Sequence, residues 1–216
     1  MSDRNATVAR LCERGIVAVV RAKSSEQLLD VAKALLAGGV DCIEITMTTP
    51  NALEVIRRCR QELAEEALIG VGSVLDPGIA SKAIHAGAQF VVSPVFNEWT
   101  IRVAHAEGVP AVPGAMTPTE ILTAANAGAD LVKVFPATRL GPEFFRDVLA
   151  PMPHLKLTPT GGVDLATAGE FIRAGAATLG VGSALVEKKA VQDGDFGKIQ
   201  SLASQFVQIV AQARGK

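Results

Sequence analysis

The sequence predicts one α/β domain, a (β/α)8 TIM barrel that takes up residues 1–216. A unit of helix, glycine turn and short apolar strand recurs along the chain. It is plain around Gly87, Gly108 and Gly128, which follow one another at intervals of 21 and 20 residues. Glycine just past a helix supplies the left-handed residue that ends it. Strands that alternate with helices form a parallel sheet, and eight such units in this length favour a compact barrel.

The expected elements follow this unit in order. Residues 1–14 are expected to form an extra helix that closes the bottom of the barrel. The eight strands are expected at 16–20, 42–46, 68–71, 89–92, 110–112, 130–134, 155–158 and 177–180. Helices fill the gaps, for example at 25–37, 51–66, 119–127 and 165–174, with a last outer helix at 195–213. Asp76, Thr117 and Asp164 mark helix starts, because their side chains can accept from free backbone N–H groups.

A doubly wound open sheet is the competing architecture. That fold usually carries a glycine-rich turn directly after its first strand, where a dinucleotide binds. The corresponding turn here, residues 21–24, reads Arg-Ala-Lys-Ser and contains no glycine. The barrel is therefore favoured, and no linker or low-complexity segment divides it.

Composition narrows the class of protein. A net charge of −1 gives no electrostatic footprint for nucleic acid or an anionic membrane. No apolar run reaches the roughly 20 residues of a membrane span, and the N-terminus lacks the apolar core of a signal peptide. Three cysteines without CxxC spacing are typical of reduced thiols. We expect a cytoplasmic protein with neither a nucleic-acid nor a membrane partner.

Two charged residues lie in strands that should be buried. Alternation places Lys133 on one face of its strand with Leu131, and Glu44 on one face of its strand with Cys42. The opposite faces are Val and Ile and should meet the outer helices, so both charges should point inward. They form either a structural ion pair or a nucleophile with its acid/base partner. A buried lysine can react with carbonyl carbons, and a buried ion pair seldom improves stability.

Glycine loops follow the last two expected strands, at residues 158–164 and 180–185. These two positions form the phosphate site of many barrels, because glycine lets backbone N–H groups approach an anion. Two ordinary tight turns are the alternative interpretation. Arg21 ends the first strand and either holds a substrate anion or joins an ion pair at the rim. The three histidines lack metal-ligand spacing, so no metal site is expected.

Several short motifs together resemble one family. They are Glu-Ile-Thr at 44–46, Gly-Val-Gly-Ser-Val at 70–74, Ser-Pro at 93–94, Pro-Gly at 113–114, Lys-Val-Phe-Pro at 133–136 and Pro-Thr-Gly-Gly at 159–162. This set is similar to the 2-keto-3-deoxy-6-phosphogluconate (KDPG) / 4-hydroxy-2-oxoglutarate (KHG) aldolases. The resemblance runs from residue 16 to about 186. It implies a class I aldolase on a (β/α)8 barrel, usually trimeric, with no cofactor and no metal.

The resemblance also implies residue roles. Lys133 becomes the Schiff-base lysine and Glu44 the general acid/base. The implied substrate-binding residues are Ser73, Thr160, Gly161, Gly162, Gly182 and Ser183, the last two at the phosphate. Arg21, Thr48, Pro94 and Phe135 are further candidate substrate-binding residues. There are two departures: many members have Arg where this chain has Thr48, and Thr where it has Ser73. That Arg is associated with the pyruvate carboxylate.

The expected reaction is cleavage of KDPG to pyruvate and glyceraldehyde 3-phosphate, with cleavage of KHG to pyruvate and glyoxylate as a second activity. Four alternatives stay open. They are an aldolase for the galactonate epimer, another barrel enzyme on phosphorylated substrates that uses Lys133 as an acid or electrostatic group, a metal-dependent class II aldolase, and a non-catalytic protein that binds phosphorylated ligands.

Overall fold

The computed structural model describes residues 4–22, 25–64 and 66–215. Within them every strand is short. The strands are β1 (Ile16–Val20), β2 (Cys42–Thr46), β3 (Leu68–Gly72), β4 (Val91–Val92), β5 (Ala111–Val112), β6 (Gly114–Ala115), β7 (Val132–Val134), β8 (Leu157–Pro159) and β9 (Leu179–Val181).

The helices alternate with these strands. They are α1 (Arg4–Arg14), α2 (Leu28–Ala37), α3 (Ala52–Leu63), α4 (Pro77–His85), α5 (Glu98–Ala106), α6 (Pro118–Asn126), α7 (Gly141–Leu149), α8 (Ala168–Arg173), α9 (Lys188–Asp193) and α10 (Phe196–Ala213), with a short 3-10 turn η1 (Ala137–Arg139) after β7.

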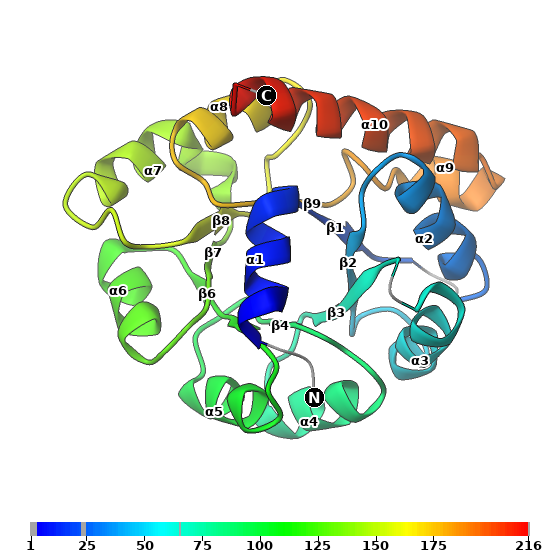
Figure 1. Cartoon of the computed structure of the whole chain (residues 1–216), viewed down its shortest axis with the longest axis horizontal. Helices are drawn as coiled ribbons and strands as arrows, with labels where there is room; N and C mark the ends of the chain where they lie inside the picture. Colours follow the sequence, from blue (N-terminus) through cyan, green and yellow to red (C-terminus); the bar gives the residue numbers. More distant parts are fainter. Residues whose placement is uncertain (1–3, 23–24, 65, 216) are drawn as a thin grey trace.

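All strand pairs are parallel and fall into two sheets. One sheet has the order β5-β4-β3-β2-β1-β9, and the other has the order β6-β7-β8. An isolated parallel bridge between Thr160 and Gly180 joins the ends of β8 and β9. The strands lie around a common axis, with the helices α2 to α10 outside them (Figure 1). This confirms the predicted parallel α/β architecture, but one continuous sheet was expected and two are found.

Pro113 separates the two sheets. It stands between β5 and β6 and has no N–H to contribute to a ladder. Its carbonyl still accepts from the backbone N–H of Lys133 at 2.9 Å. The single strand expected at 110–112 is therefore two short strands on either side of a proline.

Some expected boundaries were wrong. The strands expected at 89–92, 130–134, 155–158 and 177–180 begin two residues later. Gln89, Asp130 and Ala177 each donate a backbone bond to a neighbouring strand ahead of the ladder, and the N–H of Leu155 donates to Met152 in its own loop. The helix expected at 165–174 begins at Ala168. The Asp164 carboxylate accepts from the N–H groups of Ala166 and Thr167 and holds a turn before the helix. The caps at Asp76 and Thr117 are confirmed.

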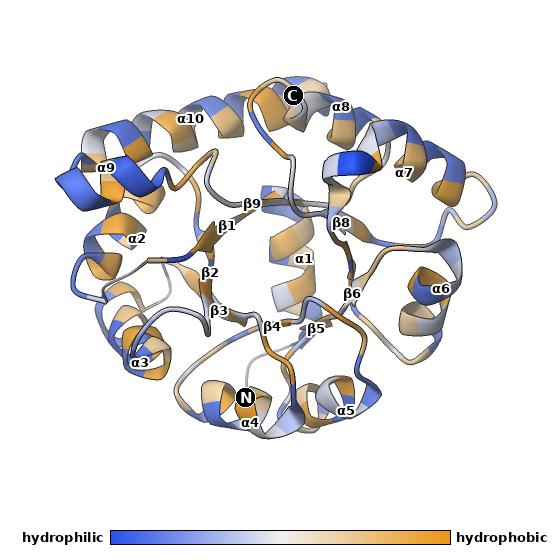
Figure 2. Cartoon of the chain, turned by 180° about the vertical axis from the view of Figure 1, so that it is seen from behind, coloured by the Kyte–Doolittle hydropathy of each residue, from blue (hydrophilic) through white to orange (hydrophobic). Residues whose placement is uncertain are grey.

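Apolar side chains form two buried clusters, one on each side of the strands. The larger lies between strands and outer helices and contains Ile43, Ile45, Val132 and Val134. The smaller lies inside the ring and contains Val8, Leu11, Val17, Cys42, Leu68, Phe90, Val92, Val112 and Leu131. The helices mix hydrophobic and hydrophilic residues, as expected for elements with one face in the core (Figure 2). The predicted alternation of inward and outward faces in β2 and around β7 is confirmed.

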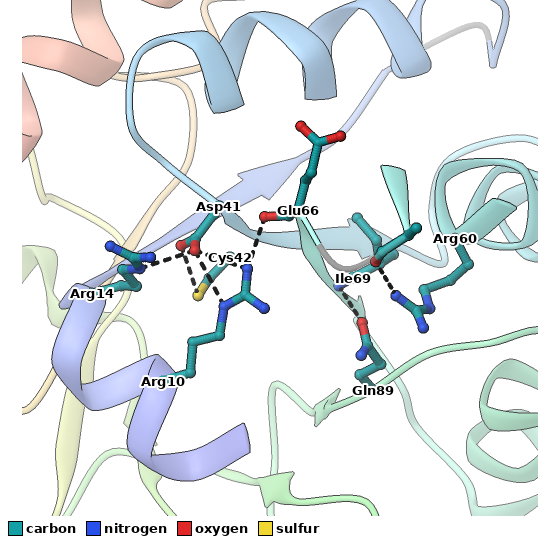
Figure 3. Close-up of polar contacts among 9 residues, drawn as sticks. Arg10, Arg14, Asp41, Cys42, Arg60, Glu66, Ile69 and Gln89 are labelled. Atoms are coloured by element: carbon teal, nitrogen blue, oxygen red, sulfur yellow. Dashed lines mark hydrogen bonds and ion pairs between the residues drawn. The ribbon is translucent and has the colours of Figure 1, made fainter. Parts of the chain in front are cut away.

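Helix α1 covers the N-terminal ends of the strands, as predicted for this segment; residues 1–3 lie outside the described part of the chain. Arg10 donates to Asp41 Oδ2 at 2.9 Å and to the carbonyl oxygen of Glu66 at 2.8 Å. Arg14 Nε lies 2.9 Å from the same Asp41 oxygen (Figure 3). Asp41 directly precedes β2, so these bonds fasten α1 across that end.

None of the helices in the described residues is long and apolar enough to cross a membrane. The three cysteines, Cys12, Cys42 and Cys59, are all free thiols.

Candidate active site

Lys133 sits at the centre of β7, between two valines that face the outer helices. Its side chain points into the ring and is only 6% exposed. Its Nζ lies 5.1 Å from the centre of the Phe135 ring, within the range of a cation–π contact. Phe135 itself is 38% exposed, so the lysine lies just beneath a partly open aromatic rim.

Glu44 reaches the same interior space from β2. It is 2% exposed, and its Oε1 is buried without a hydrogen-bond partner. Burial raises the pKa of this carboxyl, while the charges of Lys133 and, less strongly, Arg21 lower the pKa in opposition. An unpartnered buried carboxylate oxygen is costly and is concentrated at functional sites.

Lys133 and Glu44 line one small internal cavity, of about 20 Å³, together with inward-facing apolar residues such as Phe90 and Leu131. The unpartnered Glu44 oxygen does not fit the structural ion pair considered from the sequence. Thr178, which the sequence did not suggest, lines the same cavity, and its buried hydroxyl also lacks a partner. Thr178 directly precedes β9, so polar groups line the cavity at more than one level along the strands.

A larger pocket of about 450 Å³ lies at the C-terminal strand ends. Thr160 and Gly180 line both this pocket and the inner cavity, so the two spaces are adjacent. Of the predicted substrate-binding residues, the pocket brings together Arg21, Phe135, Thr160, Gly161, Gly162, Gly182 and Ser183.

The two glycine loops are shaped by their backbone. Gly161 and Gly162 have φ of 84° and 75°, in the left-handed region that favours glycine. A Cβ on Gly162 would lie 2.7 Å from Thr138 Cα in η1. A Cβ on Gly182 would meet nothing within 4 Å, so that glycine borders open space. Both loops can present backbone to a ligand at close range.

Lys188 was missed by the sequence interpretation. It is the first residue of α9, is exposed, and lines the large pocket beside the predicted Arg21. The available signal was a basic residue shortly after the second glycine loop. With both cations present, the pocket favours an anion.

Thr48, Ser73 and Pro94 lie outside the lining of this pocket. Pro94 packs closely on Gly114, where a Cβ would come 2.1 Å from the Pro94 carbonyl oxygen. Ser73 follows β3 in a left-handed conformation, with φ of 59°. Their roles toward substrate stay predictions.

Thr48 belongs to a hydroxyl network. Its Oγ1 lies 3.0 Å from that of the buried Thr46, which in turn lies 3.5 Å from Thr49 Oγ1. Thr49 Oγ1 accepts from the N–H of Ala22, next to Arg21, at 3.4 Å. The network therefore links the chain after β2 to the chain after β1. Thr46 appeared in the sequence only as the last residue of the Glu-Ile-Thr motif, and Thr49 could not be singled out from its position.

Among residues 4–22, 25–64 and 66–215, no group of three or more His, Cys, Asp or Glu side chains is placed to hold a metal ion.

Comparison with known proteins agrees with this geometry. The family model for KDPG and KHG aldolases matches residues 8–202. The chain belongs to this aldolase family. The family resemblance predicted from the motifs is therefore confirmed, and with it the lyase class.

Individual relatives cover nearly the whole chain. The 2-dehydro-3-deoxy-phosphogluconate aldolase of Treponema pallidum is 38% identical over 90% of this chain and 93% of its own. The 2-dehydro-3-deoxy-6-phosphogalactonate aldolase of Escherichia coli is 32% identical over 85% and 93%.

Solved structures match equally broadly. The KDPG aldolase of Legionella pneumophila, with pyruvate captured as a covalent carbinolamine, superposes with a TM-score of 0.85 at 27% identity, over 92% of this chain and 96% of that one. A protein cage designed by fusing symmetric oligomeric domains superposes with a TM-score of 0.86 at 28% identity, over 93% and 73%.

Proposed function

We propose that this aldolase cleaves 2-keto-3-deoxy-6-phosphogluconate to pyruvate and glyceraldehyde 3-phosphate through a Schiff base on Lys133. The observation that carries the proposal is the shared cavity of Lys133 and the unpartnered Glu44, placed directly beneath a cationic, glycine-lined pocket. The pyruvate-derived end of the substrate lies at Lys133 and Glu44, and the phosphate end lies in the pocket.

The reaction begins when Lys133 Nζ attacks the C2 ketone and forms a carbinolamine. Loss of water gives an iminium, which accepts the electron pair of the breaking C3–C4 bond. Glu44 removes the C4 hydroxyl proton, directly or through water, and glyceraldehyde 3-phosphate leaves. The remaining enamine is protonated at C3, and hydrolysis releases pyruvate and the free lysine.

The environment of Glu44 suits this task. A carboxyl whose pKa is raised by burial is a stronger base when ionised and exchanges its proton more readily near neutral pH. Oε1 makes no competing hydrogen bond, so it is free to accept from substrate or water.

The phosphate binds across the two glycine loops. Backbone N–H groups of Gly161, Gly162, Gly182 and Ser183 are the proposed donors, with Lys188 supplying positive charge at the rim. Asp164 also lines the pocket, but its carboxylate is held by the N–H groups of its own loop.

The substrate carboxylate lacks the arginine that many relatives carry at the position of Thr48. We assign it to Thr48, with Ser73 and Arg21. The Thr46–Thr49 hydroxyls support this assignment, because they hold the Thr48 loop and the Arg21 loop together.

KHG, which shares the pyruvate half, is a second proposed substrate. The galactonate epimer is an alternative, since a relative named as an aldolase for that epimer also matches.

The proposal extends to architecture. We infer one domain in which the two sheets close into a single (β/α)8 barrel, supported by the Thr160–Gly180 bridge and by the proline that alone separates β5 from β6.

Exposed apolar side chains at Leu75, Val95 and Trp99, 53–65% accessible, support self-association, for which a homotrimer is proposed. Three free thiols support a cytoplasmic location.

Borohydride reduction in the presence of pyruvate tests the function. Mass spectrometry should find one reduced pyruvyl group per chain, located on Lys133 and absent from Lys133→Met. A label on Lys156, or none, would overturn the Schiff base. Turnover of KDPG should be unaffected by EDTA, and loss of activity with EDTA would favour a metal-dependent mechanism instead.

A further inference from the structure

The Glu44 side chain lies against a glycine of the neighbouring strand. Glu44 pairs in register with Gly70 of β3, and Thr46 pairs with Gly72. The Glu44 carboxyl group nevertheless lies over Gly72, one inward-facing position closer to the C-terminal strand ends. A Cβ on Gly72 would come within 1.7 Å of Oε1, 2.4 Å of Cδ and 2.6 Å of Cγ of Glu44.

The glycine one step below has a different neighbour. A Cβ on Gly70 would come 2.3 Å from the Phe90 ring. Phe90 is fully buried and lines the inner cavity with Glu44. The ring therefore fills the space directly across from Glu44, and the carboxyl group takes the next space upward.

Hydrogen bonds do not explain where Oε1 sits, because it has no partner. The oxygen also has no cation at bonding distance to fix it, although Lys133 and Arg21 act on it electrostatically. Steric contact with the bare backbone of residue 72 is the remaining constraint on that side.

We propose that Gly72 is a positioning residue for catalysis: its missing side chain creates a slot that holds the Glu44 carboxylate toward Lys133 and the substrate without hydrogen-bonding it. This rests on the proposed aldolase function. A carboxylate fixed by carbon contacts keeps its oxygen available for proton transfer, whereas donors at the same place would hold it ionised. The slot needs space only, since the backbone of Gly72 is not in the left-handed region.

The test compares Gly72→Ala in two backgrounds. In the otherwise unchanged enzyme, turnover should fall by about 10²-fold or more, the scale of a lost acid/base group, while KM changes little and borohydride still traps pyruvate on Lys133. In the Glu44→Gln enzyme the same change should cost less than about threefold, because the two changes remove one function. Gly70→Ala is the matched control, and its effect should multiply with that of Glu44→Gln.

A stability cycle covers the case in which Gly72→Ala does not fold. The Tm lost in Gly72→Ala should be largely regained in Glu44→Ala/Gly72→Ala, where the clashing side chain is gone. Three results would each overturn the proposal that Gly72 positions Glu44. They are near-normal turnover in Gly72→Ala, equal losses of turnover in both backgrounds, and a double variant as unstable as Gly72→Ala. Failure of the unchanged enzyme to trap pyruvate would instead overturn the proposed function.

Discussion

The two ends of the strand ring differ in whether their buried carboxylates have bonding partners. At the N-terminal end, Asp41 is buried and meets Arg10 and Arg14, and α1 closes over the apolar interior. At the C-terminal end, Glu44 is buried with one oxygen unpartnered, and glycine loops replace bulky side chains. Both acidic residues belong to one stretch of chain, since Asp41 directly precedes β2 and Glu44 lies within it. Satisfied charge at one end contributes to stability, and unsatisfied charge at the other is available for chemistry.

The largest effect expected is at Lys133. Lys133→Met should lower aldol cleavage by at least about 10⁴-fold, since it removes the nucleophile. The variant should lose stability near neutral pH, because it leaves the buried Glu44 carboxyl without the charge that opposes the rise in its pKa. Cleavage assays and thermal unfolding provide the two measurements. An unchanged Tm would mean that the stability of this end does not depend on the Lys133 charge.

Glu44→Gln should lower turnover by about 10²–10⁴-fold while pyruvate is still trapped. It should also change the pH dependence of stability. Burial raises the pKa of Glu44 in the folded state, so stability is lost as pH rises from about 4.5 through that raised pKa.

Glutamine cannot ionise, so the Tm gained by Glu44→Gln should grow from acid toward neutral pH. Thermal unfolding between pH 4 and 8 checks the sign. A gain that shrinks as pH rises would show that the carboxylate is better stabilised in the fold than in water.

At the opposite end the expected pattern is reversed. Asp41→Asn leaves Arg10 and Arg14 without their shared anion and should lower the free energy of unfolding by about 1–3 kcal/mol. Turnover per folded molecule should stay unchanged, because Asp41 lies at the far end of the strands from the pocket. Urea unfolding and active-site titration separate the two quantities. A fall in turnover without a matching loss of stability would show that the two ends of the strands are not functionally separate.

Thr48→Arg should tighten pyruvate binding, if the loop accommodates the longer side chain. Hydrogen bonds from a charged donor contribute about 1.5–3 kcal/mol, against about 0.5–1.5 kcal/mol for neutral donors. Arg21→Ala is the companion variant and should weaken binding. If it binds pyruvate as well as the original protein, Arg21 does not hold the carboxylate.

The smallest effect is expected at Lys188. Lys188→Ala should raise KM for the phosphorylated substrate by about two- to fivefold, and added salt should diminish the difference, because exposed charges are screened. Lys189→Ala is the control, since Lys189 is exposed on the same helix and pairs with Asp193. Equal effects from both lysines would show that the helix contributes only general positive charge.

Much of this site was predictable because strands alternate with a period of two. That rule placed Glu44 and Lys133 on the inward faces and the Val and Ile residues outside, as the structure has them. It carries no information about what faces a side chain across the ring. The slot at Gly72 and the orphaned hydroxyl of Thr178 depend on neighbours far away in sequence.

Loops limited the prediction more than strands. The Thr46–Thr48–Thr49 contacts depend on how the chain turns after β2, and Lys188 reaches the pocket only because α9 starts beside it. The later start of α8 follows from local hydrogen bonds of Asp164, which compete with helix formation. The break at Pro113 was readable in principle, since proline cannot extend a ladder.

An isolated bridge between Thr160 and Gly180, with one backbone bond from Ala177 to Leu157, joins β8 to β9, which makes their junction a seam. The loops that line the pocket continue from both of its sides, with Gly161 and Gly162 on one and Gly182 and Ser183 on the other. A ligand held by both loops therefore links β8 and β9 across this junction. Ligand binding therefore raises the free energy of local opening at this junction. Amide hydrogens of β8 and β9 should exchange more slowly once the pocket is filled. In this protein the substrate helps to complete the fold that binds it.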